Sequence, residues 1–452
     1  MKNIKYILAC FVFLFAACED NVDITPTDII VGDASSINSL EAARDFMNGA
    51  YIFVPNPVGF GDLGADNAKL APTNTGQGVF VHNWLYNAQQ PQDNWVGQYR
   101  LLGNVNTLLQ AIDAIEIAPG EEVERDQIKA EALALRAYTL FNLYRFYSPG
   151  ADASSAFGVV VATTPLAPAD TPARGTVGDV LNQINTDIDD AYALFPTDGI
   201  TQLDLLSKPA TAALGARVAL EQGNWSDAID WADDAISLSG KSIASMTEYP
   251  LVWRDNSTAG VIFTSLRTPT GYLSTFNRIT NADIFYYGSD GLFNSYDDAD
   301  VRKSFNFMDD GTGQIVTKWP SDQTVPAIDA KLFRVEEMVL IKAEAYANMN
   351  MLTEAAGEIN DLRDDRIMGY TDISYANQGD ALTDILEERR RELAFEGFRF
   401  FDLKRVGMGV ARDASDCVTA ECDLAAGAIQ FNLPIPQQEI DSNPNMVQNP
   451  GY

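Results

Sequence analysis

Apolar residues recur every three or four positions along most of the chain, which is the period of an amphipathic helix. The clearest example runs from Glu124 to Tyr147, and Ser148-Pro149-Gly150 stops it. The same period predicts further helices over residues 39–54, 92–115, 176–195, 209–223, 224–239, 333–350, 353–366 and 381–405. Strand-like runs are short and few, at residues 157–162, 261–266 and 314–319. We therefore expect a mostly α-helical protein with a few short strands.

Two of the predicted helix pairs have a common spacing. Gly223 separates the first pair and Asn350 takes the same place in the second, and both residue types tolerate a left-handed bend. Ala228 and Ala355 follow at matching positions, where a small side chain lets two helices approach closely. The spacing is typical of a tetratricopeptide-like superhelix of stacked hairpins, although unrelated helical hairpins would satisfy it too.

Two long segments interrupt the helical pattern, near residues 55–92 and 240–330. Irregular loops of this length are uncommon in compact domains and usually carry function. Both segments contain many aromatic residues, which argues against disorder. We expect them to be ordered insertions into the helical scaffold.

The start of the chain has the composition of a secretion signal. A short cationic stretch precedes an apolar run at residues 7–15, which is too short to cross a bilayer. Small residues then lead to Cys18, as at a bacterial lipoprotein cleavage site, where this cysteine would be lipidated. An ordinary signal peptide with an incidental cysteine is the alternative. We expect a signal peptide at residues 1–17 and one mature domain at residues 18–452.

The charge balance excludes several classes of function. The chain carries 63 acidic and 31 basic side chains, a formal charge of −32, so it has no basic surplus for binding nucleic acid or anionic lipid. His82 is the only histidine, which rules out a multi-histidine metal site. We expect no cofactor, apart from opportunistic calcium at the acidic turns of residues 297–300 and 309–311.

Cys417 and Cys422 are the cysteines that remain once the signal peptide and Cys18 are set aside. Four residues separate them in a Gly-, Ala- and Asp-rich stretch, so in an exported protein they can close a small disulfide loop. Two free thiols are the alternative, and a zinc site would lack its other ligands.

Glu388, Glu392 and Glu396 lie four residues apart on one face of a predicted helix, with Arg391 and Arg399 beside them. This is the spacing of an i,i+4 ion-pair ladder. A glycosidase pair is the alternative, but its carboxylates must face each other across a sugar ring, whereas residues on one helix flank the same side. We interpret the motif as fold-specifying rather than catalytic.

The C-terminal third contains motifs that occur together in one protein family. They are Arg334, Glu336, LIKAEA at 340–345, ERRRELAFEG at 388–397, Arg399, Asp402, Leu403, Arg405, LPIP at 433–436, Asn443-Pro444 and the ending QNPGY at 448–452. With the lipoprotein-like start, they resemble the SusD/RagB family. The resemblance implies a surface lipoprotein, anchored through Cys18 to the outer membrane of a Bacteroidetes cell, that captures a glycan. It also implies a SusC-like TonB-dependent transporter as the partner that receives this glycan.

A glycan-binding surface needs flat aromatic side chains for the apolar faces of sugar rings and polar side chains for their hydroxyl groups. Members of the resembled family commonly place such contacts in the early loop and in loops between helical repeats, which selects candidates by region only. The candidate ligand contacts are Trp84, Tyr86, Asp62, Asp66, Tyr272, Tyr286, Tyr287 and Trp319. Core packing is the alternative for Trp84, and loop capping is the alternative for the two aspartates. At most one of the adjacent tyrosines faces outward in an extended segment.

These observations predict a non-enzymatic surface lipoprotein that binds an oligosaccharide or polysaccharide and delivers it to the transporter. Two other hypotheses stay open. One is a nutrient lipoprotein that binds peptides, and the other is a helical-repeat adaptor that binds only a protein partner.

Overall fold

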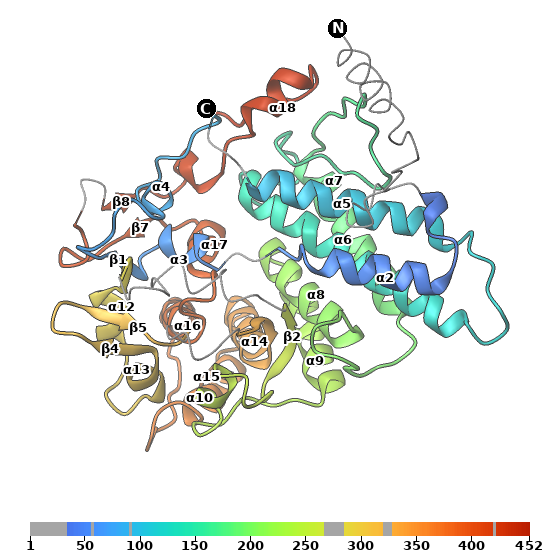
Figure 1. Ribbon diagram of the computed structural model, residues 1–452. Helices are drawn as coiled ribbons and strands as arrows, with labels where there is room; N and C mark the ends of the chain where they lie inside the picture. Colours follow the sequence, from blue (N-terminus) through green and yellow to red (C-terminus); the bar gives the residue numbers. More distant parts are fainter. Residues whose placement is uncertain (1–33, 56–57, 90–92, 266–283, 320–327, 419–421) are drawn as a thin grey trace, which may run out of the picture.

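The computed structural model describes residues 34–452 except 56–57, 90–92, 266–283, 320–327 and 419–421. The predicted signal peptide, Cys18 and Tyr272 therefore lie outside the described residues. Within the described part the protein is mostly α-helical with a few short strands, which confirms the predicted fold class (Figure 1).

The N-terminal part of the chain forms a layer of long helices and a group of short elements outside it. The layer consists of α2 (Leu40–Tyr51), α5 (Asp93–Ile112), α6 (Glu122–Tyr147) and α7 (Val177–Leu194). The short elements are η2 (Ala34–Ser36), which contacts α5, and α3 (Phe60–Leu63), β1 (Ala68–Leu70) and α4 (Val79–His82). α6 packs against α2, α5 and α7 and is buried along most of its length, which places it at the centre of this layer. Thr176 and Asp179 form a capping box at the start of α7, which explains why this helix begins where the sequence predicts.

Two helical hairpins follow the predicted tetratricopeptide-like spacing. They are α8 (Lys208–Gln222) with α9 (Trp225–Ser239) and α14 (Val335–Asn348) with α15 (Leu352–Asp364). α9 packs against α14, so the two hairpins stack. Gly223 has φ +71° and Asn350 has φ +60°, the left-handed bends that these residue types tolerate. A Cβ at Gly215 would lie 2.8 Å from the Trp231 indole, so the close crossing of α8 and α9 requires glycine there.

The described strands form three small antiparallel sheets. The strands are β2 (Val261–Ser265), β3 (Tyr286–Gly288), β4 (Phe307–Asp309), β5 (Gln314–Val316), β6 (Ala330–Arg334), β7 (Val410–Ala411) and β8 (Asp423–Leu424). Their orders are β1-β3-β5-β4, β2-β6 and β7-β8. Leu70 pairs with Tyr286, so the largest sheet joins the two long inserted segments. The strand predicted at residues 157–162 does not form, because Gly158 and Val159 exchange backbone hydrogen bonds only with Gly175.

The prediction of a single helix over residues 381–405 is wrong, because the chain forms two helices there. They are α16 (Gln378–Glu392) and α17 (Arg399–Arg405). Between them Phe395 has φ +65° and Gly397 has φ +86°, which no α-helix contains. The remaining elements are α10 (Tyr249–Val252), α12 (Asp290–Ser295), α13 (Val301–Asn306), η3 (Ile429–Phe431) and α18 (Gln437–Ser442).

Two groups of buried side chains form most of the core. The larger group lies among the long helices and the stacked hairpins. The second group consists largely of aromatic residues from the inserted segments, among them Tyr249, Trp253 and Phe285. Figure 1 shows α12, α13, β4 and β5 beside α16, on the opposite side from the layer of α2, α5 and α6. The described parts of the insertions therefore share a core of their own.

Candidate ligand-binding site

The two described tryptophans that the sequence predicts as ligand contacts are buried. Trp84 is 6% exposed, and its indole N–H donates to the carbonyl of Gly64 at 2.8 Å while the Arg412 guanidinium lies 4.3 Å from its ring centre. Trp319 is 3% exposed and donates to the carbonyl of Phe395 at 2.9 Å. The expectation that these indoles face solvent is wrong, since each has both packing and a polar partner inside the protein.

The predicted tyrosines within the described residues are buried as well. Tyr86 and Tyr286 each donate their hydroxyl to a backbone carbonyl, and Tyr287 donates to the Asp310 carboxylate at 2.9 Å. Neither of the adjacent tyrosines faces outward, because the four-stranded sheet is covered at both positions. Tyr272, the last predicted aromatic contact, lies outside the described residues.

Asp62 and Asp66 anchor the early loop to the turn between α16 and α17. Asp62 is fully buried and accepts the backbone N–H groups of Phe395 at 3.0 Å and Gly397 at 2.7 Å. Burial raises the pKa of Asp62 to about 6 despite these hydrogen bonds. Burial also acts to raise the pKa of Asp66, but the guanidiniums of Arg399 and Arg390 outweigh it and lower that pKa. Asp62 therefore caps a turn that is distant in sequence, and Asp66 is held in ion pairs, so neither makes the local loop cap that the sequence suggests as the alternative.

The structure also bears on the disulfide and the calcium turns that the sequence suggests. The structure joins Cys417 and Cys422 in a disulfide, with their Cα atoms 5.3 Å apart. At the first predicted calcium turn, Asp298 pairs with Lys303 and Asp300 pairs with Arg302. Among the described residues, no three His, Cys, Asp or Glu side chains are grouped so that they could hold a metal ion. None of the described helices has the length and apolar character needed to span a membrane.

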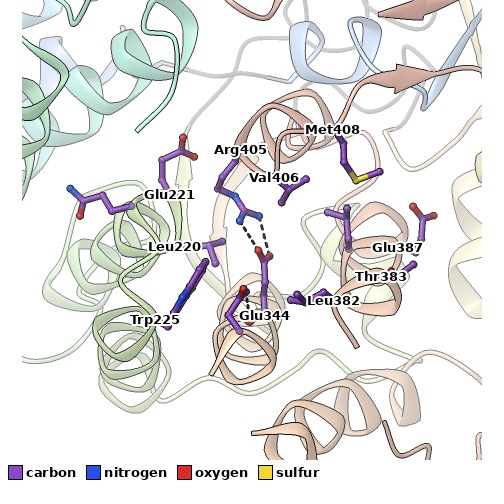
Figure 2. A pocket seen from close by; sticks show the side chains of 14 residues that line it. Leu220, Glu221, Trp225, Glu344, Leu382, Thr383, Glu387, Arg405, Val406 and Met408 are labelled. Atoms are coloured by element: carbon purple, nitrogen blue, oxygen red, sulfur yellow. Dashed lines mark hydrogen bonds and ion pairs between the residues drawn. The ribbon is translucent and has the colours of Figure 1, made fainter. Parts of the chain in front are cut away.

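A cavity of about 540 Å³ lies where the two helical hairpins meet α16 and α17 (Figure 2). The Trp225 indole forms one wall, and the chain places it there through the bend at Gly223. A Cβ at Gly223 would lie 3.4 Å from the indole, so the ring packs over the bend. Because Trp225 is only half-buried, part of its ring remains open to the cavity.

Both apolar and polar side chains line the rest of this Trp225 cavity. Leu220, Leu382, Val406 and Met408 provide apolar walls, as Figure 2 shows. The polar lining consists of Glu221, Gln222, Glu344, Asn348, Thr383, Glu387 and Arg405. An aromatic wall with hydroxyl, amide and carboxylate groups at its edges is the composition that a site for a sugar ring requires.

The charged groups of the cavity are mostly committed to each other. Arg405 donates to both carboxylate oxygens of Glu344, at 2.5 and 3.0 Å. Glu221 accepts the Tyr144 hydroxyl at 3.2 Å, and burial raises the pKa of its carboxyl group above the usual value. Glu387 is the exception, because its side chain is 35% exposed and its two ion pairs to Arg399 and Arg390 are long, at 3.2 and 3.5 Å.

A larger cavity of about 1340 Å³ lies between α2, the start of α6 and the chain before α8. Its deepest polar group, Glu131, is fully buried and accepts hydrogen bonds from Arg44, Tyr51 and Gln127. The Tyr51 hydroxyl also accepts the backbone N–H of Leu206, which fixes its ring. The aromatic residues of this cavity are Tyr51, whose hydroxyl is held by Glu131 and Leu206, and Phe263, which is 1% exposed. The Trp225 cavity, with an indole wall open to it, is therefore the better candidate for a sugar ring.

Sequence reasoning missed Trp225 as a candidate contact, although the signal is present. The residue follows Gly223 and Asn224 directly, and a bend of this kind projects the next side chain from the end of a hairpin. The spacing of Gly223 and Ala228 is sufficient to predict the hairpin, but it does not show that the tryptophan between them faces a cavity. The early loop likewise exposes Phe80 (57%) and Leu85 (52%) rather than the predicted Trp84.

Comparisons with known proteins agree with this fold and these motifs. The SusD family model matches residues 301–452, and a family described as starch-binding and associating with the outer membrane matches residues 47–220. SusD-like protein P2 of Formosa agariphila is 24% identical over 416 residues, which cover 79% of this chain and 80% of the relative. The starch-binding protein SusD of Bacteroides thetaiotaomicron is 31% identical over 166 residues, 36% of this chain and 28% of the relative.

A solved structure extends the similarity to the whole fold. The crystal structure of a SusD superfamily protein from Bacteroides thetaiotaomicron superposes with a TM-score of 0.79 at 26% identity, covering 91% of this chain and 100% of that one. The matches therefore include both the N-terminal helical layer and the C-terminal motifs, which confirms the resemblance seen in the sequence. The chain belongs to the SusD/RagB family.

Proposed function

We propose that this protein binds an oligosaccharide in the Trp225 cavity at the cell surface and passes it, uncleaved, to a SusC-like TonB-dependent transporter. The observation that carries the proposal is the half-buried Trp225 indole, open to a cavity whose other walls carry both apolar and polar side chains. The C–H faces of a pyranose stack on such a ring, while its hydroxyl groups need the amides and hydroxyls at the edges.

The family supports a carbohydrate as the ligand. One matching family model is described as starch-binding, and the relative from Bacteroides thetaiotaomicron is named a starch-binding protein. The predicted contacts Trp84, Tyr86, Tyr286, Tyr287 and Trp319 cannot supply a stacking surface in this conformation, because they are buried. The Trp225 cavity provides what those residues were expected to provide.

Binding without cleavage is supported by the state of the carboxylates in the cavity. Glycoside hydrolysis needs one carboxylic acid to protonate the leaving group and one free carboxylate to act as nucleophile or base. Glu344 is held bidentately by Arg405, and Glu221 accepts the Tyr144 hydroxyl. Glu387 alone is only weakly paired, so the cavity lacks the second available carboxyl group that hydrolysis needs.

The location and the partner follow from the start of the chain and from the family. The Cys18 motif predicts a lipid anchor, and the family model that matches residues 47–220 is described as associating with the outer membrane. A binding protein anchored beside a transporter holds its ligand at high local concentration, which favours transfer. A protein partner alone would leave the Trp225 cavity without a role, and a peptide ligand is an outcome that the titration below distinguishes.

The test is calorimetric titration of the lipid-free chain from residue 19 with neutral glucan oligosaccharides, both starch-type and β-1,3-linked. Saturable binding is expected, with no new reducing ends over the same period. Trp225→Ala should weaken binding by about 5- to 150-fold, the effect of about 1–3 kcal/mol of aromatic stacking. Trp225→Phe keeps a ring and should lose less.

Trp231→Phe is the matched control. Trp231 lies on the same helix and is half-buried, but it packs against Tyr192 with ring centres 4.9 Å apart and does not line the cavity. Unchanged affinity in Trp225→Ala would refute the cavity as the site. Binding of peptides instead of glycans, or new reducing ends, would refute the proposed function.

A further inference from the structure

We infer that the Trp225 cavity accepts uncharged sugar rings and rejects glycans whose rings carry carboxylate or sulfate groups. The inference rests on the proposed function and adds the class of glycan to it. It follows from which charged groups line the cavity and which of them have a hydrogen-bonding group left for a ligand.

The lining has an excess of negative charge. Glu221, Glu344 and Glu387 contribute three carboxylates, and Arg405 is the only cation among the described residues of the lining. The Arg405 guanidinium is already paired with carboxylates, since it donates to both oxygens of Glu344 and, at 3.3 Å, to Asp402. An anionic ring substituent entering the cavity would therefore meet three carboxylates and one guanidinium whose charge is already balanced by the protein.

The cations behind the lining are bound to other groups of the protein. Lys404 donates to the backbone carbonyls of Arg145 at 2.6 Å and Ser148 at 2.7 Å. Arg399 holds Asp66 bidentately at 2.9 and 3.0 Å, and it reaches the lining only as a partner of Glu387, as Arg390 does. Protein sites that bind carboxylate or sulfate groups use charge-assisted, often bidentate, contacts from Arg or Lys, whereas the arginines at this cavity are already paired with its own carboxylates.

The uncharged polar groups of the cavity suit sugar hydroxyls instead. The Gln222 Oε1 accepts from the side-chain amides of Asn185 and Asn224, which leaves its Nε2 without a partner among the described residues. Thr383 donates its hydroxyl to a backbone carbonyl, so its oxygen lone pairs face outward. Donors and acceptors of this kind match hydroxyl groups, which both give and accept hydrogen bonds.

The first experiment tests the sign of the electrostatic potential around the Trp225 indole and needs no known ligand. Collisional quenching of tryptophan fluorescence is measured with iodide, caesium and acrylamide, and the Trp225 contribution is the difference between the wild type and Trp225→Phe. Each quenching constant is divided by its value for free N-acetyltryptophanamide, because the quenchers differ in intrinsic efficiency. Acrylamide and caesium should quench Trp225, whereas normalised iodide quenching should be about three- to tenfold weaker than normalised caesium quenching at low salt. Added salt should reduce the difference between iodide and caesium quenching, because it screens the carboxylates.

Two variants distinguish the effect of the charges in the cavity from the effect of the protein's overall charge. Glu387→Lys should raise iodide quenching of Trp225 toward the caesium value. Asp230→Asn removes an exposed carboxylate from α9 outside the cavity and should leave the ratio of iodide to caesium quenching of Trp225 unchanged. Equal quenching by iodide and caesium in the wild type would overturn the inference, and so would an equal effect of both variants.

The second experiment compares matched ligands. A neutral glucan oligosaccharide and its carboxymethylated form are titrated into the wild type and Glu387→Lys. The anionic form should bind the wild type at least about tenfold more weakly, and Glu387→Lys should reduce the difference. Equal or tighter binding of the anionic form would overturn the inference while the proposed function stands. Binding of neither form, with iodide still excluded, would overturn the proposed function and leave the charge selection of the cavity intact.

Discussion

Replacing Glu392 by glutamine should destabilise the protein strongly, because this carboxylate is the centre of a buried ion cluster. Its Oε1 accepts from Arg334 at 3.0 Å and Arg366 at 3.1 Å, and its Oε2 accepts from Arg302 at 3.0 Å and Arg366 at 2.9 Å. Glu392 and all three arginines are nearly inaccessible to solvent. A glutamine would remove the charge and turn an N–H₂ group toward guanidinium donors.

The size of the destabilisation in Glu392→Gln follows from the ion pairs that remain. Breaking a buried ion pair by removing one partner costs about 3–5 kcal/mol, because the other charge remains buried. Each arginine here keeps another carboxylate: Glu388 for Arg302, Glu396 for Arg334 and Glu336 for Arg366. Because this pairing is retained, the free energy of unfolding should fall by about 3 kcal/mol, the lower end of that range. Since a domain is stable by about 5–15 kcal/mol, the variant should still fold.

Glu387→Gln is the matched control on the same helix. It makes the same chemical change five residues earlier, and glutamate and glutamine have similar helix propensities. Its partly exposed ion pairs should contribute no more than about 1 kcal/mol. Urea unfolding followed by far-UV circular dichroism and tryptophan fluorescence gives both values. A Glu392→Gln loss no larger than that of Glu387→Gln would refute the argument that the buried cluster dominates.

Three further predictions concern the same molecule. Unfolding free energy should fall as the pH drops below about 4.5 in urea titrations, because the arginines hold the pKa values of Glu388 and Glu392 below their unfolded values, so protons bind the unfolded chain preferentially; constant stability between pH 5 and 3 would contradict this. Replacing both Cys417 and Cys422 by serine should cost about 2 kcal/mol, the loop-closure value for so short a loop, and a larger loss in thermal unfolding would show that the loop supports its neighbours. Cys18→Ala should release the protein from the membrane fraction of expressing cells, and undiminished membrane attachment would show that Cys18 is not the anchor.

The sequence predicted the helices well because each depends on local information. The hairpin bends at Gly223 and Asn350 and the cap of α7 at Thr176 are all encoded within a few residues of where they act. The exception is the break between α16 and α17. Phe395 adopts positive φ because Asp62, more than 300 residues away in sequence, accepts its N–H group, and no local pattern contains that contact.

The predicted ligand contacts failed for a related reason. An aromatic residue in a long loop is exposed only if the loop lacks a core of its own, and here the two inserted segments build one together. Trp319 packs against Trp253 with ring centres 5.0 Å apart, and this contact depends on how the segments fold back on each other. The burial of Trp84 likewise depends on Gly64 and Arg412, which are distant in sequence.

The glutamates of α16 show the same division between local and distant information. The i,i+4 spacing was interpreted as an ion-pair ladder along one helix, and Arg391 does pair with Glu388 at 2.7 Å. Most partners of these glutamates, however, come from other elements: Arg302 from α13, Arg334 from β6 and Arg366 from beyond α15. The cluster therefore joins elements across the fold, in keeping with a fold-specifying role.

The same C-terminal motif also shapes the floor of the Trp225 cavity. Asp402 accepts from Arg389 at 3.0 Å and from Arg405 at 3.3 Å, and Arg405 in turn holds Glu344. Each of these side chains is nearly buried and has several charged partners, so changing one costs stability throughout the cluster.

Side chains at the rim are under weaker constraint. Within the described part of the chain, Gln222 is half-buried and makes only two long hydrogen bonds, at 3.3 and 3.4 Å, and Thr383 is exposed with one bond to its own helix. Residues with so few contacts near the surface can be exchanged at a cost of a few tenths of a kcal/mol. The rim around Trp225 can therefore change its preference among glycans while the charged floor keeps the cavity in shape. Glu387 is at the boundary between the two, since it lines the cavity yet pairs only weakly, and this is why its substitution should alter ligand charge selection without unfolding the protein.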